Sequence, residues 1–149
     1  MSAATDRYEK FIEHVAKSGT VWVLDQQGEV ATTVSEQLED TKGHPVDVVC
    51  FWSNKLLAKV CGRQNWPDHR PQELSLAEFL EDWCAGLHND NLLAGINFDL
   101  DLAGHEADPL GLVVALVDRL RVENKEVALE QFKSLEEMQT QARNIIKRY

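Results

Sequence analysis

The chain has 149 residues, of which 44% are hydrophobic, and this is enough to form one domain with its own core. Its formal net charge is -10, and a surface of that sign repels the phosphates of nucleic acids and of anionic membranes. The sequence shows no basic and apolar leader, and no run approaches the roughly 20 apolar residues that span a bilayer. We therefore expect a cytoplasmic protein that binds neither nucleic acid nor a membrane.

The first part of the chain predicts a helix followed by a β-hairpin. Residues 6–17 place apolar side chains at helical spacing. Residues 20–24 and 30–34 are rich in β-branched and alternating residues, with a turn between them. Residues 35–45 are polar and contain glycine and proline, so we expect a surface loop there.

The next segment predicts a buried strand that runs directly into a helix. Residues 46–52 are apolar enough to be buried on both faces of a sheet. Ser53 is positioned to cap a helix that ends at Gly62. The apolar side chains expected to face inward are Leu56, Leu57, Val60 and Cys61. Two prolines exclude a regular helix in residues 63–71, and residues 72–74 are suited to a short strand.

We expect residues 73–99 to be the centre of the fold. Ser75 and Glu78 form an S-x-x-E capping box at a helix start. One apolar helix face is then predicted from Leu76, Phe79, Leu80, Trp83, Cys84 and Leu87. Polar residues supply a turn at 89–91, and residues 92–98 have the composition and length of a strand.

The last part of the chain predicts two further helices after an acidic connection at residues 99–108. Asp108 and Pro109 are a favourable cap and first residue for one helix. Residues 126–149 predict one long amphipathic helix. Its apolar stripe is interrupted by Gln139 and lacks a clean heptad, which argues against a coiled coil.

Together these elements predict an α+β fold in a single domain. We expect a small, mostly antiparallel or mixed sheet of about four to five strands packed with helices in residues 1–121. Residues 122–149 are expected to form a C-terminal helical extension, packed on the domain or on a second copy of the chain. The second arrangement would make the protein a homodimer.

The cysteines predict no catalysis. Cys50, Cys61 and Cys84 have no C-x-x-C spacing, and each lies among apolar residues. Cys61 and Cys84 also fall late in their predicted helices, where the helix dipole does not favour a thiolate. We therefore expect three buried free thiols.

The acidic connection is the segment whose side chains best match a metal-binding or catalytic site. Asp99 and Asp101 lie two residues apart, a spacing that points both side chains one way in an extended chain, and Glu106 follows. A calcium loop is excluded because Leu110 stands where its bidentate carboxylate must be. Two alternatives remain for these carboxylates. They form a looser divalent-cation site, or they accept hydrogen bonds from the amides of nearby turns. His88 is the best single candidate for acid–base chemistry, or is simply solvated or paired with a carbonyl.

Trp66 is the tryptophan that differs from the other three. Trp22, Trp52 and Trp83 fall on apolar strand or helix positions, whereas Trp66 lies in a proline-containing loop with basic neighbours. Aromatic and arginine side chains are enriched at binding surfaces, so Trp66 is a binding candidate. The alternative is that its ring closes the edge of the core.

Several separated blocks of the sequence are similar to a family of small bacterial proteins known as domain of unknown function 2750. The resemblance covers about residues 8–120. It rests on Phe51, Trp52 and Ser53 before a helix, Trp66, the helix of Glu78 to Trp83, the block Ile96 to Asp99, and Gly104, Glu106 and Pro109. Phe98 stands where the family pattern often has tryptophan. The resemblance implies no activity.

Two classes of function follow from these observations. The first is a non-enzymatic cytosolic interaction or accessory protein of bacterial origin, because no catalytic set is recognisable. The second is a small enzyme or a metal-dependent ligand-binding protein that uses Asp99 to Asp108 with His88. We assign no catalytic residue, metal ligand or cofactor, and the binding-surface candidates are Trp66, His88, Asp99, Asp101 and Glu106.

Overall fold

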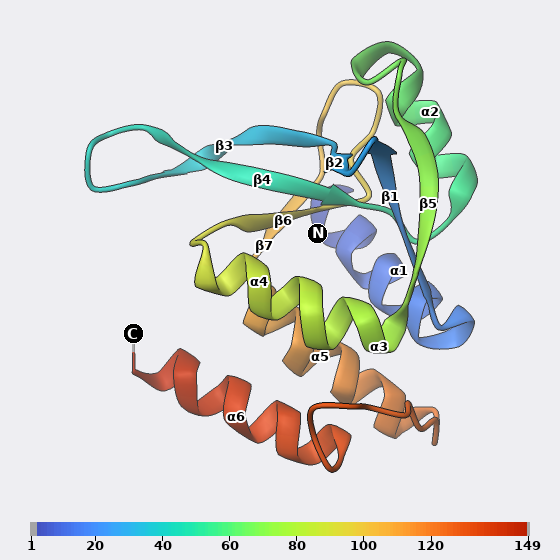
Figure 1. Ribbon diagram of the computed structural model, residues 1–149, viewed down its shortest axis with the longest axis vertical. Coiled ribbons are helices and arrows are strands. Elements are labelled where there is room, and N and C mark those ends of the chain that lie inside the picture. The colour runs from blue at the N-terminus through green and yellow to red at the C-terminus, as the bar shows by residue number, and fades with distance from the viewer. Residues whose placement is uncertain (1–2, 149) are drawn as a thin grey trace.

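The computed structural model describes residues 3–148 and shows an α+β domain with two sheets (Figure 1). The first sheet has the order β2-β1-β5 and is antiparallel. The second has the order β3-β4-β6-β7, in which only β4 and β6 are parallel. The strands are β1 (Thr20–Gln26), β2 (Glu29–Val30), β3 (Thr32–Glu39), β4 (Pro45–Phe51), β5 (Arg70–Ser75), β6 (Leu93–Ile96) and β7 (His105–Ala107). The predicted α+β class is confirmed, and the strands divide between two sheets.

The helices pack mainly below the sheets in the view of Figure 1, with α2 at the far side of the first sheet. They are α1 (Ala3–Ser18), α2 (Lys55–Asn65), α3 (Leu76–Glu78), η1 (Phe79–Trp83), α4 (Cys84–Asn89), α5 (Pro109–Val122) and α6 (Leu135–Lys147). The larger core cluster lies among α1, the α3–α4 segment, α5 and both sheets. A smaller cluster around Trp52 and Phe98 lies under α2. In the described part of the chain, no helix is long and apolar enough to cross a membrane.

The central helix is continuous from α3 through α4 but contains one wide turn. Ser75 caps it as predicted, because its Oγ accepts from the amide of Glu78 at 3.1 Å. At η1 the amide of Cys84 donates to the carbonyl of Phe79, which is the i→i+5 pattern of a π-helix. The predicted apolar face is buried, apart from the half-buried Trp83. The same turn contains a buried carboxylate, that of Glu81.

The predicted loop at residues 35–45 is instead most of a long hairpin. β3 continues to Glu39, and Glu39 pairs with Pro45. Only residues 40–44 form the turn, where the Asp40 carboxylate accepts from the amides of Lys42 and His44. The prediction of a loop was wrong because it relied on polar composition. An exposed edge strand needs few apolar residues when its backbone is paired.

The predicted inward face of α2 is confirmed only at Cys61. Leu56, Leu57 and Val60 are 69%, 40% and 42% exposed, whereas Ala58, Cys61 and Gly62 are buried. The cap is Asn54 rather than Ser53. Small residues form the buried face because α2 approaches β1 closely: a Cβ on Gly62 would lie 2.8 Å from Leu24 Cδ1.

The C-terminal helix begins at Leu135, nine residues later than predicted from Glu126. Ser134 caps it, and the preceding segment is irregular. The buried Glu81 carboxylate holds that segment, because it accepts from the amides of Glu130 and Gln131 at 3.2 and 2.8 Å. α6 then packs on α5 of the same chain, with Met138, Gln139 and Ala142 buried.

Candidate functional site

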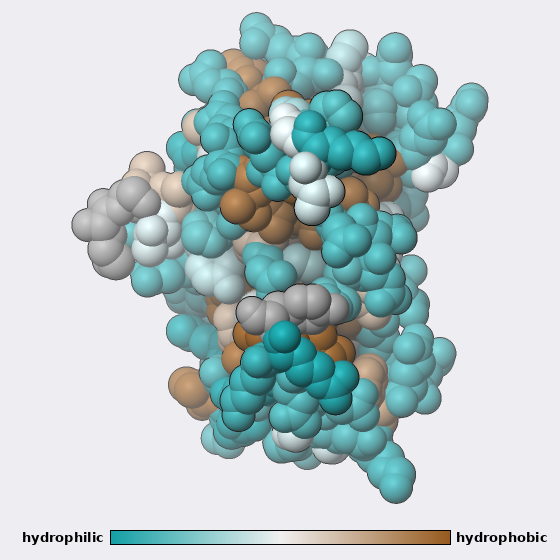
Figure 2. Space-filling model, turned by 90° about the vertical axis from the view of Figure 1, so that its left-hand side faces the viewer, coloured by the Kyte–Doolittle hydropathy of each residue, from teal (hydrophilic) through white to brown (hydrophobic). Residues whose placement is uncertain are grey.

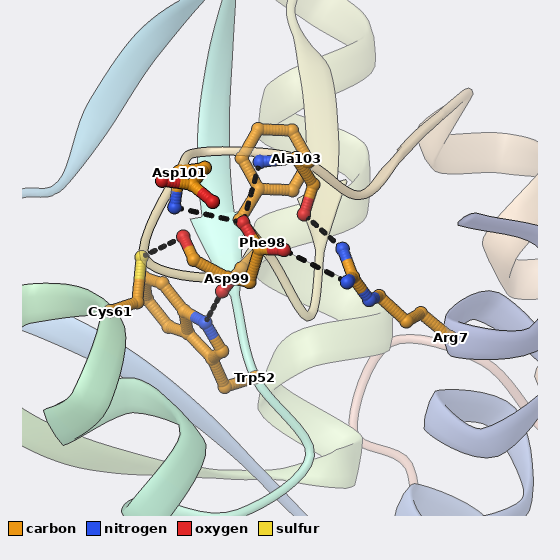
Figure 3. A network of polar contacts seen from close by, with 7 residues as sticks. All are labelled: Arg7, Trp52, Cys61, Phe98, Asp99, Asp101 and Ala103. Carbon is orange, nitrogen blue, oxygen red and sulfur yellow. Dashed lines mark hydrogen bonds and ion pairs between the residues drawn. The ribbon is translucent and has the colours of Figure 1, made fainter. Parts of the chain in front are cut away.

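The loop that follows β6 is held by a network of polar contacts centred on Asp99 (Figure 3). Asp99 Oδ1 accepts from the amides of Asp101 and Ala103 at 2.9 and 3.0 Å. Asp99 Oδ2 forms an ion pair with Arg7 of α1 at 2.8 Å, and Arg7 also donates to the carbonyl of Ala103. The backbone carbonyl of Asp99 accepts from Cys61 Sγ at 3.1 Å. One residue thus connects α1, α2 and the loop.

These contacts set the charge state of Asp99. Partial burial by itself would raise the pKa of Asp99. The two amide hydrogen bonds and the Arg7 guanidinium outweigh that effect, so the pKa lies below its usual value. The Asp99 carboxylate is therefore ionised, and both of its oxygens accept hydrogen bonds from the loop amides or from Arg7.

Packing and hydrogen bonds beneath the loop account for the residue types at positions 97, 98 and 104. Trp52 Nε1 donates to the carbonyl of Phe98 at 2.9 Å, and both side chains are buried. The Asn97 side chain accepts from the amide of Ser53 at 2.9 Å and donates to its hydroxyl at 3.1 Å. A Cβ on Gly104 would lie 2.4 Å from Phe98 Cδ1, so only glycine fits there. Many residues that carry the family resemblance therefore meet around this loop.

The other acidic candidates are not gathered with Asp99 into a metal site. Glu106 in β7 accepts from the hydroxyl of Ser35 and from the amide of Glu36 at 2.9 Å, which ties β7 to β3. Asp108 caps α5 by accepting from the amide of Gly111 at 2.8 Å. Asp101 is exposed. Among residues 3–148, no group of three or more His, Cys, Asp or Glu side chains is placed to hold a metal ion.

His88 lies in the last turn of α4 and lines an apolar groove that we call the hairpin groove. Its volume is about 450 Å³. The walls come from the β3–β4 hairpin, the start of β6, the start of α5 and the end of α6. The groove is lined by the apolar residues Leu38, Val46, Leu92, Leu93, Pro109, Leu110, Ile145 and Ile146 and by His88, Asn91 and Asp108. Figure 2 shows hydrophobic surface among polar areas on this side of the molecule.

Trp66 lies between the core and a second, smaller pocket. Its ring is partly buried and packs edge-on against Trp52, with ring centroids 6.4 Å apart. It also lines a cavity of about 260 Å³ between α2 and β5, which we call the α2 pocket. The ring closes the edge of the smaller core cluster and also forms part of a pocket wall, and a binding role for Trp66 stays a prediction.

The structure separates the five candidates into four places, one of which is Glu106 between β7 and β3. His88 and Asp108 line the hairpin groove, Asp99 and Asp101 belong to the loop after β6, and Trp66 lines the α2 pocket. The sequence analysis missed Leu38 as part of a groove. The available signal was an exposed leucine within a polar segment, which becomes informative only once residues 35–39 are placed in a strand.

Comparison with known proteins identifies a family for most of the chain. A family described as "Protein of unknown function (DUF2750)" matches residues 8–116. The chain therefore belongs to this family, as the resemblance predicted. No curated protein and no solved structure matches the chain.

Proposed function

We propose that this protein is a non-enzymatic interaction protein of the bacterial cytoplasm, and that it binds an apolar, positively charged segment of a partner protein in the hairpin groove. The observation that carries the proposal is the groove itself, about 450 Å³ in volume and lined mainly by hydrophobic side chains. Apolar grooves are typical places for an amphipathic helix or an extended segment to dock.

The rim of the groove supports a peptide-like occupant. Leu38 and Ile146 are 52% and 41% exposed on opposite walls, so hydrophobic area remains available outside the cavity. β3 is also the edge strand of its sheet, because it pairs only with β4. Beside the groove, however, the amides of Glu36, Gln37 and Leu38 already donate to Glu106 or to Ser35 Oγ. An incoming segment is therefore held there by its side chains rather than by new strand pairing.

The charge of the hairpin supports a basic partner. Residues 32–47 carry four exposed carboxylates, those of Glu36, Glu39, Asp40 and Asp47, against the single ammonium of Lys42. The whole chain has the same sign, with a net charge of -10. Complementary charge increases the rate of association and excludes acidic partners. A segment that combines apolar anchors with Lys or Arg fits both features.

The alternative function, an enzyme or metal-dependent binder that uses Asp99 to Asp108 with His88, has weaker support. His88 and Asp108 do line one groove. However, the Asp108 carboxylate caps α5, and Asp99 bonds to α1 and to its own loop. Melting curves with and without divalent cations test the metal form of this alternative, because specific binding to the native state raises the midpoint.

A photo-crosslinking residue at position 38 tests the interaction proposal. The segment captured in the native host is identified by mass spectrometry, synthesised as a peptide and titrated into the purified protein. We expect an apolar and basic peptide whose affinity falls at least about tenfold in L38S and I146S, since each removes a hydrophobic anchor. V122S is the matched control, because Val122 is 75% exposed and does not line the groove.

Two results would contradict the proposal. One is a captured peptide that binds L38S and the unmodified protein equally well. The other is capture of the chain's own sequence, which would favour the predicted homodimer over a separate partner. Light scattering of the purified protein measures the dimer directly.

A further inference from the structure

The α2 pocket lies on a different side of the molecule from the hairpin groove. In Figure 1, α2 and β5 lie opposite the tip of the β3–β4 hairpin and the end of α6. The pocket has a volume of about 260 Å³ and is formed by the second half of α2, the loop after it and the start of β5. No function has been assigned above to its residues other than Trp66.

Three unpaired cations surround this pocket in a protein that is otherwise strongly acidic. Lys59, Arg63 and Arg70 all line it, and within residues 3–148 none of them forms an ion pair or a side-chain hydrogen bond. By contrast, Arg119 and Arg143 are each paired with a carboxylate elsewhere in the chain. A concave surface lined by charge of one sign concentrates its electric field and attracts counter-ions.

Among the described residues, no carboxylate lines the pocket or forms an ion pair with its three cations. Asp25 lies opposite Arg70 in the β1–β5 pairing, but its carboxylate accepts from the amide of Gly28 at 3.4 Å. Asp68 is exposed in the loop before β5. Neither residue lines the pocket, and its lining contains no Asp or Glu side chain.

His69 is a further polar residue of the pocket wall. It lines the pocket, and its Nδ1 is buried without a hydrogen-bond partner among the described residues. Buried polar atoms normally have partners, but this nitrogen has almost no exposed surface, so a ligand in the pocket does not reach it as the side chain lies.

The remaining lining is apolar and flat. The Trp66 ring is fixed edge-on against Trp52 at an interplanar angle of 73°, and Pro67 and Pro71 line the pocket beside it. A rigid aromatic and proline surface suits the organic part of a ligand, whereas the cations suit its charged part. Arginine guanidinium groups match phosphate oxygens in a bidentate geometry.

We propose that the α2 pocket binds a small phosphate monoester. Arg63, Arg70 and Lys59 hold the phosphate, and the surface of Trp66 and the prolines contacts the organic group. The proposal does not depend on the interaction function, because the two sites have separate walls.

Calorimetric titration of the full-length protein with phenyl phosphate, inorganic phosphate and benzoate tests the proposal. We expect phenyl phosphate to bind more tightly than either other probe, since it alone combines the dianion with a flat apolar group. The K59Q/R63Q variant should weaken phenyl phosphate binding at least about tenfold, because charge-assisted contacts to phosphate are lost. K10Q is the control: Lys10 is exposed on α1 and outside the pocket.

Nuclear magnetic resonance gives a second readout that does not depend on affinity. Phenyl phosphate should shift the indole resonance of Trp66, assigned with W66F, and the ring nitrogens of His69, and should leave Trp83 unchanged. The proposal is overturned if no probe binds the unmodified protein at millimolar concentration, or if K10Q weakens binding as much as K59Q/R63Q. An acidic peptide that binds where all three probes fail would instead identify a protein-docking surface and also overturn it.

Discussion

Arg7 and Asp99 form an ion pair at 2.8 Å although they lie 92 residues apart in the chain. The contact joins the first turns of α1 to the loop after β6, and the same loop reaches α2 through Cys61. A carboxylate that looked in the sequence like part of a binding site therefore serves as a structural junction. We therefore expect removal of the Asp99 carboxylate to lower the stability of the fold rather than to affect ligand binding.

Replacing Asp99 with alanine should lower the free energy of unfolding by roughly 1–3 kcal/mol. The two loop amides and Arg7 lose their acceptor, and the lost hydrogen bonds have this order of magnitude. Urea unfolding measures the change. D101A is the matched control, because the Asp101 side chain is exposed. Equal losses in D99A and D101A would contradict the structural role. A double-mutant cycle with R7A should give a coupling below about 1 kcal/mol, since both side chains are partly exposed.

His105 should make the protein less stable in mild acid. Burial lowers the pKa of His105 below its usual 6.5, although the Glu106 carboxylate opposes the shift. The unfolded chain then binds a proton that the native protein does not, so the free energy of unfolding falls as the pH decreases from above 6.5 through the lowered pKa. Urea unfolding between pH 7.5 and about pH 5 measures this slope. H105Q should flatten it, whereas H14Q, which changes an exposed residue of α1, should not.

Gly104 and Gly86 should respond oppositely to the same substitution. In G104A the new Cβ would lie 2.4 Å from Phe98 Cδ1 and 2.8 Å from the carbonyl oxygen of Ile96, so the loop must move. We expect a loss of about 1–3 kcal/mol, as for other overpacked sites. In G86A the Cβ meets nothing within 4 Å in a helix, which predicts no change or a gain of up to about 1 kcal/mol. Thermal melting distinguishes them, and a stable G104A would disprove the close packing.

The three cysteines should react slowly with a thiol reagent in the native protein. Burial raises the pKa of Cys61 from 9.0 to about 11, and burial also raises the pKa values of Cys50 and Cys84. Because the thiolate is the reactive form, this shift alone slows Cys61 about a hundredfold at pH 8. Reaction with a disulfide reagent, followed before and after denaturation, measures the difference. Rapid reaction of one thiol in the native protein would reveal local opening. Such a raised pKa also makes the protein lose stability as the pH rises from 9 towards 11.

The sequence predicted well those elements whose large apolar residues point to the core. The helix face from Leu76 to Leu87 and the buried strand ending in Phe51 follow directly from hydrophobic periodicity. The small residues Ala58 and Gly62 of the buried face of α2 were missed because hydrophobic periodicity favours large side chains. They are buried because α2 lies close to β1. β7 was missed because its three residues are defined by pairing with β6.

The candidate sites depended on contacts that the sequence could not provide. Leu38 and Ile146 lie on two walls of one groove although they are far apart in the chain. Lys59 and Arg63 were visible as a pair four residues apart in a helix, but Arg70 joins them only because β5 runs beside α2. Asp99 was selected for its chemistry, and only the structure shows that its carboxylate contacts Arg7 and its own loop.

The attachment of α6 should depend on one buried amide, that of Gln139. This side chain is 2% exposed, and its Nε2 donates to the carbonyl of Val114 at 3.0 Å and to Asp118 Oδ1 at 2.8 Å. Its Oε1 accepts from Arg121 at 3.1 Å. Q139L keeps a similar volume but removes all three hydrogen bonds, so we expect a loss of roughly 1–3 kcal/mol, although Asp118 and Arg121 keep their ion pairs.

Hydrogen exchange identifies the part of the structure that the Q139L substitution destabilises. In Q139L, protection should decrease mainly in α6 and in the neighbouring turns of α5, because α6 contacts the domain chiefly through α5. Q141L is the matched control, since Gln141 is exposed on the same helix. If Q139L is as stable as Q141L, the polar contacts do not fix α6, and the hydrophobic contacts of Met138 and Ala142 with the core must be sufficient to hold the helix.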